Sequence, residues 1–189
     1  ALTLTGNISI NSAGGNLTFD TNTGNIIVSS VVSGVGNLIK SGSGVLTLSN
    51  AANTYTGSTS ITGGTLSFAT IANGGSNSSI GATIAATPIS ISGGGILSYT
   101  GITAATDRQI SIGSGGGTVQ TTNPVFGYTL TLNGNINGGG NAITLDTTET
   151  FISIPAVISN ASSLTKTCLA TVVLSGANTY TGPTIINTS

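Results

Sequence analysis

The sequence predicts an all-β protein built as a β-solenoid, and three observations lead to this prediction. Only 4% of the 189 residues are charged and 4% are aromatic, whereas glycine is abundant at 29 residues. Short runs rich in β-branched residues, which favour strands, alternate with clusters of Gly, Asn and Ser. Similar segments return along the chain, which is typical of repeat architectures. Strong helix formers are nowhere concentrated, so we expect no helix longer than two turns.

The predicted strands are runs of about three to five residues in which aliphatic and polar side chains alternate. This alternation places the aliphatic side chains of a strand on one face. Glycines between the runs allow the positive φ angles that corners need. Runs this short become stable only when each one is hydrogen-bonded to the run one turn above and below it. In chain order, the clearest runs are residues 2–4, 17–20, 26–28, 45–48, 89–91, 109–112 and 129–132.

An antiparallel sandwich is the alternative to a parallel solenoid. A sandwich favours longer strands joined by two-residue hairpins such as Asn-Gly. Here the glycine clusters are long, at residues 93–95, 115–117 and 138–140, and the strands are short. These features favour the solenoid, whose turns commonly take about 20 residues.

An internal repeat organises the chain. Residues 2–8 read LTLTGNI and residues 130–136 read LTLNGNI, and an NTYTG motif occurs at 53–57 and again at 178–182. The repeat unit is therefore roughly 126 residues long. We expect a first solenoid unit at 1–128 and a partial second unit, continuous with it, at 129–189. Both ends lie within strand-like sequence, so we expect them to be points within a longer chain.

The segment Val45–Ser49, followed by NTYTG and by Ile61–Leu66, resembles the autotransporter-associated β-strand repeat of bacterial autotransporters and giant surface proteins. A second match runs from Leu174 to Ile186. The resemblance implies a right-handed parallel β-helix that is exported and displayed on the bacterial surface, and it carries no catalytic residue over to this chain. One turn departs from the pattern, because Cys168-Leu169-Ala170 stands where the repeat has Gly-x-Gly.

Chemistry-bearing residues are few. The chain has no histidine, and its single cysteine, Cys168, is either a small buried hydrophobe or a thiol at a turn that could pair with another chain. Asp146 and Glu149 form the only close acidic pair, which we interpret as solvated carboxylates on a turn. Asp107 and Arg108 are interpreted as a local surface pair. Neither a metal nor a cofactor is expected, because no glycine cluster is followed by the residues of a calcium nonapeptide or a phosphate loop.

Ten residues are expected to have structural roles. Asp20 and Lys40 are 20 residues apart, as are Asp146 and Lys166, so one hypothesis places a salt bridge between adjacent turns in each copy. The alternative places these charges on the outer face without contact. The other six belong to the two NTYTG motifs: Asn53, Tyr55, Gly57, Asn178, Tyr180 and Gly182. The tyrosines either pack against the next turn or bind sugar.

The composition favours a structural or adhesive segment of a long bacterial surface or extracellular fibre, not an enzyme. We expect it to associate with itself through strand edges and uncharged polar faces. A glycan-binding or glycan-cleaving β-helix module is the alternative, and it would need a cluster of carboxylates or aromatic rings. The expected partners are the chain itself, other cells or surface glycans. A net charge of −1 leaves no basic patch for nucleic acid, and no apolar stretch is long enough for membrane insertion.

Overall fold

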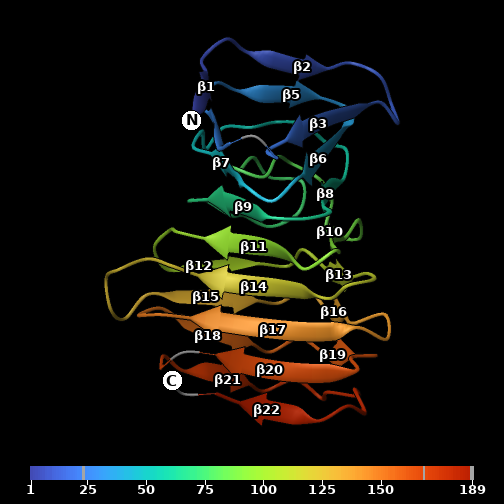
Figure 1. Cartoon of the computed structure of the whole chain (residues 1–189), viewed down its shortest axis with the longest axis vertical. Helices are drawn as coiled ribbons and strands as arrows, with labels where there is room; N and C mark the ends of the chain where they lie inside the picture. The colour runs from blue at the N-terminus through green and yellow to red at the C-terminus, as the bar shows by residue number, and fades with distance from the viewer. Residues whose placement is uncertain (23, 168, 188–189) are drawn as a thin grey trace.

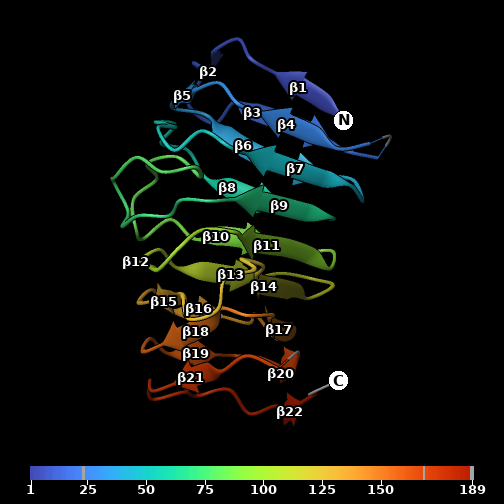
Figure 2. The same ribbon diagram turned by 90° about the vertical axis from the view of Figure 1, so that its left-hand side faces the viewer.

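The chain is a single coil of short parallel strands. The computed structural model describes residues 1–22, 24–167 and 169–187. Strands stack along one long axis, with the N-terminus and the C-terminus at opposite ends (Figures 1 and 2). Within the described ranges every pairing between named strands is parallel and no helix occurs, so the structure confirms the β-solenoid and excludes the antiparallel sandwich. No helix here is therefore long and apolar enough to cross a membrane.

The strands lie on three faces of the coil, and the second face has two sheets, β2-β5 and β12-β15-β18-β21, with no named strand on the described turns between them. The first face contains β1 (Leu2–Leu4), β4 (Ile26–Val28), β7 (Val45–Leu48), β9 (Thr65–Phe68), β11 (Gly95–Tyr99), β14 (Gly117–Thr121), β17 (Ala142–Thr147), β20 (Ser163–Thr167) and β22 (Thr184–Ile186). The second face contains β2 (Ile8–Ile10), β5 (Val32–Gly34), β12 (Ala104–Thr106), β15 (Thr129–Leu132), β18 (Phe151–Ile154) and β21 (Val172–Leu174). The third face contains β3 (Asn16–Asp20), β6 (Asn37–Ser41), β8 (Thr59–Ile61), β10 (Ile89–Ile91), β13 (Ile110–Ile112), β16 (Ile136–Asn137) and β19 (Ile158–Ser159).

The core is a set of aliphatic columns inside the coil. On the first face, Leu46, Leu66 and Leu97 are register partners on successive turns, and all three are buried. Burying one such side chain contributes roughly 1.5–3 kcal/mol, so each added turn extends the core and is stabilised by it. The alternate residues Thr47 and Ser67 lie on the other side of the same strands and are partly exposed. The period-two pattern in the sequence therefore corresponds to inside and outside.

A long connection, residues 69–88, joins β9 to β10. Register partners on the first face are 20 residues apart between β7 and β9 but 31 apart between β9 and β11. Residues 53–56 pair with β5 on the second face, and the 69–88 connection lies beside them, between that segment and β12. The connection buries Ile71 and Ile80 against the coil, so it is part of the core and not only a surface loop.

The two copies of the sequence repeat occupy different faces. Residues 37–41 form β6 on the third face, whereas their counterparts, residues 163–167, form β20 on the first face. Five steps along the third face lead from β6 to β19, and β20 is the next strand of the chain. One repeat unit thus spans about five and one third turns, and the second copy is rotated by one face relative to the first.

Candidate functional site

The first NTYTG motif forms a corner that is hydrogen-bonded to the preceding turn and to the following turn. Asn53 is fully buried, and its Oδ1 accepts a hydrogen bond from the Val32 backbone N–H at 2.8 Å. Its Nδ2 donates to the backbone oxygens of Asn50 at 3.2 Å and Ser79 at 2.7 Å. The side-chain amide therefore takes the place of a strand residue in the ladder, and no buried polar atom of Asn53 is left without a partner.

Tyr55 and Gly57 complete this corner. The Tyr55 ring is fully buried, and its hydroxyl lies 2.8 Å from Thr59 Oγ1. Burial raises the pKa of the Tyr55 hydroxyl to about 12, against smaller opposing effects of the Thr59 hydrogen bond and of Arg108. A Cβ on Gly57 would lie 2.1 Å from the Gly36 carbonyl oxygen, so only glycine allows the chain to approach the previous turn this closely.

The second motif repeats these contacts on the third face. Asn178 Oδ1 accepts from the Ile158 backbone N–H at 2.8 Å, and Tyr180 Oη lies 2.8 Å from Thr184 Oγ1. A Cβ on Gly182 would lie 2.0 Å from the Ser162 carbonyl oxygen. Tyr180 is only partly buried. The structure thus brings Asn, Tyr and Gly together in each corner, and the shared contacts are structural.

Lys40 and Asp20 are not brought together. In the ladder Lys40 is opposite Phe19, and Asp20 is opposite Ser41, so the two charged side chains leave their strands on opposite faces. The Lys40 ammonium is inside the coil and donates to the carbonyl oxygens of Ser41, Gly42 and Gly63 at 3.0, 2.8 and 2.8 Å. Burial lowers the pKa of Lys40, partly offset by Asp20. The predicted salt bridge is wrong for this pair, because the ladder offset is 21 residues and the spacing is 20.

Lys166 has the same place in its strand as Lys40. It is opposite Leu145 in the ladder and lines the interior near Leu164 and Leu174. Asp146 Oδ2 accepts from Gln120 Nε2 at 2.7 Å, and its Oδ1 accepts from Thr167 Oγ1 at 2.6 Å. An ion pair between Asp146 and Lys166 stays a prediction. Cys168, and with it the interpretation of its thiol, lies outside the described residues.

The interpretation of Asp107 and Arg108 as a local surface pair is wrong, because Arg108 is buried. Its side chain is 1% exposed, and its guanidinium donates to the carbonyl oxygens of Ile80, Gly81 and Thr83 at 2.7–3.1 Å. Burial lowers the pKa of Arg108, and its Nε has no hydrogen-bond partner. Asp107 Oδ1 accepts from the Gly74 backbone N–H at 2.7 Å. Both residues hold the 69–88 connection on the coil, a role that only long-range packing could reveal.

The remaining acidic residues form no cluster. Asp146 is a half-buried strand residue, whereas Glu149 is exposed on the following turn, so only Glu149 fits the interpretation as a solvated turn carboxylate. Across the described part of the chain, no group of three or more His, Cys, Asp or Glu could hold a metal ion.

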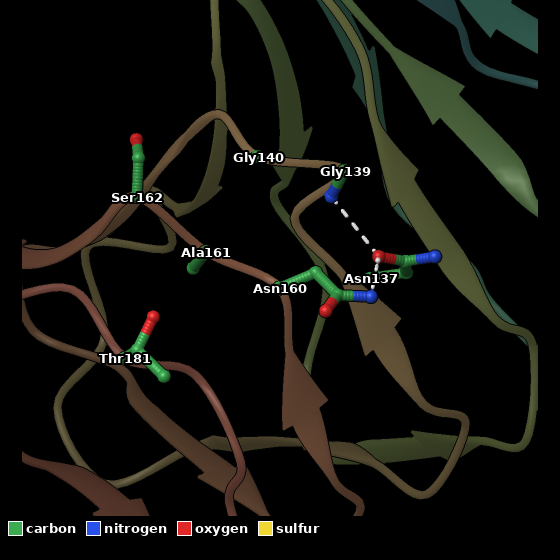
Figure 3. A pocket seen from close by; sticks show the side chains of 7 residues that line it. All are labelled: Asn137, Gly139, Gly140, Asn160, Ala161, Ser162 and Thr181. Atoms are coloured by element: carbon green, nitrogen blue, oxygen red, sulfur yellow. Dashed lines mark hydrogen bonds between the residues drawn. The ribbon is translucent and has the colours of Figure 1, made fainter.

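An open polar hollow lies where the third face turns toward the first, over the last turns of the coil (Figure 3). Its volume is about 410 Å³. Asn137 Oδ1 accepts from the Gly139 backbone N–H at 3.0 Å and from Asn160 Nδ2 at 3.3 Å. None of the lining side chains is ionisable. They are Asn137, Gly139, Gly140, Asn160, Ala161, Ser162 and Thr181. The sequence alone did not indicate this hollow, because its residues come from three turns.

Comparisons with known proteins agree with this arrangement. The family described as Passenger-associated-transport-repeat matches residues 38–68 and 164–188, which include both NTYTG corners. The chain is 36% identical over 148 residues, 78% of its length, to the "Adhesin BmaC autotransporter" of Brucella suis biovar 1 (strain 1330). It spans only 4% of that protein. No solved structure matches.

Proposed function

Because the chain is an autotransporter passenger-repeat segment of a bacterial cell-surface or extracellular protein, we propose that it is a structural and adhesive part of a long surface fibre. The continuous parallel ladder carries this proposal, because each turn extends the same core and lengthens the coil by about 4.8 Å. The adhesive part is supported by the name of the relative, which describes an adhesin. We also propose that residues 1–128 are one repeat unit and 129–189 part of the next.

Adhesion is tested with beads that carry the folded chain. We expect these beads to adhere to cultured epithelial cells more than beads that carry the same chain after irreversible unfolding. Equal adherence of the two kinds of bead would contradict the adhesive role and leave only the structural one.

We propose that the segment also associates with itself, through its strand edges and its uncharged outer faces. The outer row on the first face, with Thr118, Thr144 and Thr165 in register, contains no charge. Near the start of the second-face strands, Phe126 is 69% exposed and Leu169 is 80% exposed. Apolar side chains this exposed favour association, and a net charge of −1 hardly opposes it. Sedimentation velocity should show oligomers that decrease in Phe126→Ser; a monomer at all concentrations would exclude self-association.

We propose that the segment catalyses no reaction and needs no cofactor, and that neither nucleic acid nor membrane insertion is part of its role. In support, the charged residues that the structure describes are engaged in holding turns together or are scattered on the surface. The alternative of a glycan-binding module gains support from one feature, the polar hollow. The alternative of a glycan-cleaving module gains none, because Asp146 is engaged by Gln120 and Thr167.

A further inference from the structure

The hollow beside Asn137 and Asn160 has the chemistry of a site for an uncharged polyol. Its volume of about 410 Å³ lies within the range of about 300–1,000 Å³ that is usual for ligand sites. Such sites are mostly apolar, whereas this one is lined by amides, hydroxyls and glycine backbone. A ligand that matches this lining supplies many hydrogen-bonding groups and needs no charge.

Several polar atoms of the hollow are available to a ligand. Asn137 Nδ2, Asn160 Oδ1 and the hydroxyls of Ser162 and Thr181 have no hydrogen-bond partner in the described part of the chain. The Asn137 amide nitrogen is a donor, the Asn160 amide oxygen is an acceptor, and each of the two hydroxyls can be either. Sugar hydroxyls are likewise donors and acceptors. The two amides are bonded to each other across adjacent turns (Figure 3), so they are positioned before a ligand arrives.

The comparison of the two repeat copies indicates that these side chains are not needed for the turn. Asn160 has φ of 51°, and it is the only residue other than glycine with a positive φ in the described ranges. Its counterpart 126 residues earlier is Gly34, which has φ of 105°. The counterpart of Ser162 is Gly36. Glycine satisfies the positive φ at position 160 without strain, so the Asn160 side chain is not needed for the backbone, and the glycine at the counterpart of Ser162 shows that the fold does not require that hydroxyl.

A peptide suits the hollow less well than a glycan. Peptides commonly bind by adding a strand to an open sheet edge. Here the backbone N–H groups of Gly138, Gly139 and Gly140 already donate to Ser159, Asn137 and Asn160. The hollow has no aromatic or large aliphatic side chain that would hold a peptide side chain.

We propose that this hollow binds an uncharged glycan chain, with Asn137, Asn160, Ser162 and Thr181 as its contacts. The proposal deepens the adhesive function proposed above and rests on it. Adjacent turns are about 4.8 Å apart, comparable with the length of one sugar ring, so consecutive sugars of an extended chain can meet consecutive turns. Binding at one site is weak, and an array of repeats strengthens it by multivalency.

The test uses the whole 189-residue chain on a printed array of neutral and acidic oligosaccharides, followed by calorimetry with the neutral oligosaccharide that binds best. The double variant Asn160→Gly/Ser162→Gly restores the residues of the first copy. We expect it to weaken binding about tenfold or more, as expected for losing at least one hydrogen bond. Its melting temperature should change little, because glycine relieves the positive φ at Asn160 whereas it adds conformational entropy to the unfolded chain at Ser162. Asn7→Gly, at an exposed asparagine of another turn, should bind like the original chain.

Each outcome decides between the proposals. Binding should not depend on NaCl concentration, because no lining side chain is ionisable. An array on which no neutral glycan binds, undiminished binding by the double variant, or capture of unstructured peptides instead would overturn this inference. Beads that adhere to cells equally well with the double variant would leave the adhesive function standing and overturn the glycan site as its contact. Failure of all beads to adhere, with glycan binding intact, would overturn the adhesive function alone.

Discussion

Lys40 occupies an aliphatic column as if it were a hydrophobic residue. It lies between Phe19 and Ile61 in the ladder of the third face, and its ammonium reaches three carbonyl oxygens at the corner. A buried ammonium is costly unless its three donors are satisfied, and here each donor has an acceptor. The side chain therefore joins two adjacent turns by hydrogen bonds to backbone rather than by an ion pair.

Substitution separates the carbonyl contacts from the ion-pair hypothesis. Lys40→Met keeps an apolar stem of similar length but removes the three hydrogen bonds, so we expect the free energy of unfolding to fall by about 1–3 kcal/mol. Asp20→Asn should change it by less than about 0.5 kcal/mol, because Asp20 is exposed and does not contact Lys40. Urea denaturation measures both. A larger effect of Asp20→Asn than of Lys40→Met would restore the salt bridge.

Tyr55 makes stability depend on alkaline pH. Its hydroxyl has a pKa of about 12 in the folded chain and an ordinary value of 10.0 when exposed. Below pH 10 both states hold the proton. Between pH 10 and 12 only the unfolded chain loses it, so stability falls by about 3 kcal/mol over this window. The lowered pKa of Lys40 acts in the opposite direction, since below pH 10.5 the unfolded chain holds more protons and stability rises with pH.

The variant Tyr55→Phe isolates the tyrosine contribution. It loses the hydrogen bond to Thr59, so we expect it to be about 1 kcal/mol less stable at neutral pH. Between pH 10 and 12 its stability should decline less than that of the original chain, so the two plots of unfolding free energy against pH should cross, leaving the variant about 2 kcal/mol more stable near pH 12. Parallel curves across this window would show that Tyr55 ionises in the folded chain at an ordinary pH.

The sequence contains part of this residue-scale detail. Alternation with Leu38 already puts Lys40 on the inner face, and this signal competes with the 20-residue spacing that predicts a salt bridge. A one-residue change of register moves a side chain to the other face, so spacing alone is a poor guide to contacts. Arg108 could not be placed in advance, because its burial depends on the 69–88 connection folding over it.

At the scale of single elements, the NTYTG corner is a compact device for passing from one turn to the next. Its asparagine completes the ladder, its tyrosine fills the corner and its glycine allows close approach. The sequence predicts these residues to be structural, and the same contacts appear in both copies. What the motif does not reveal is the face on which it lies, because that depends on the lengths of all the connections between the copies.

The close approach of Gly57 to the Gly36 backbone predicts that the corner cannot accept a side chain at position 57. Gly57→Ala places a Cβ 2.1 Å from the Gly36 carbonyl oxygen, which neither backbone can avoid without opening the ladder. We expect a loss of about 3 kcal/mol or failure to fold. Gly6→Ala is the matched control, because a Cβ there would have no atom within 4 Å. Denaturation curves of the two variants measure the difference; equal stability would mean that the corner tolerates a side chain.

At the scale of the whole molecule, stability is shared between neighbouring turns. Each strand pairs only with the turn above and the turn below, as in other repeat proteins. In this chain we therefore expect amide hydrogen exchange to be slowest in β9, β11 and β14 and fastest in β1 and β22, which have one neighbour each. Exchange measured by mass spectrometry tests this gradient. Uniform protection along the coil would show that it unfolds as a single cooperative unit.

The fold class was within reach of the sequence at this scale, because short alternating runs between glycine clusters suit a parallel coil better than a sandwich. The rotation between the two repeat copies could not be predicted from the sequence. Similar segments at a spacing of 126 residues suggest equal positions, yet 37–41 and 163–167 are on different faces. The fraction of a turn per unit becomes visible only when every strand has been assigned to its face.

That fraction has a geometrical consequence for any run of such units. Five and one third turns per unit means that three units complete sixteen turns, so a given corner points in the same direction again only after three further copies. Equivalent corners then trace a spiral like the thread of a screw, with three directions of approach. A filament of such units therefore presents the same pattern of corners on each of its three faces. The patterns on the three faces differ only by a displacement along the axis. Adding or removing a single strand between two units would turn everything beyond it by one third of a revolution while leaving each unit intact.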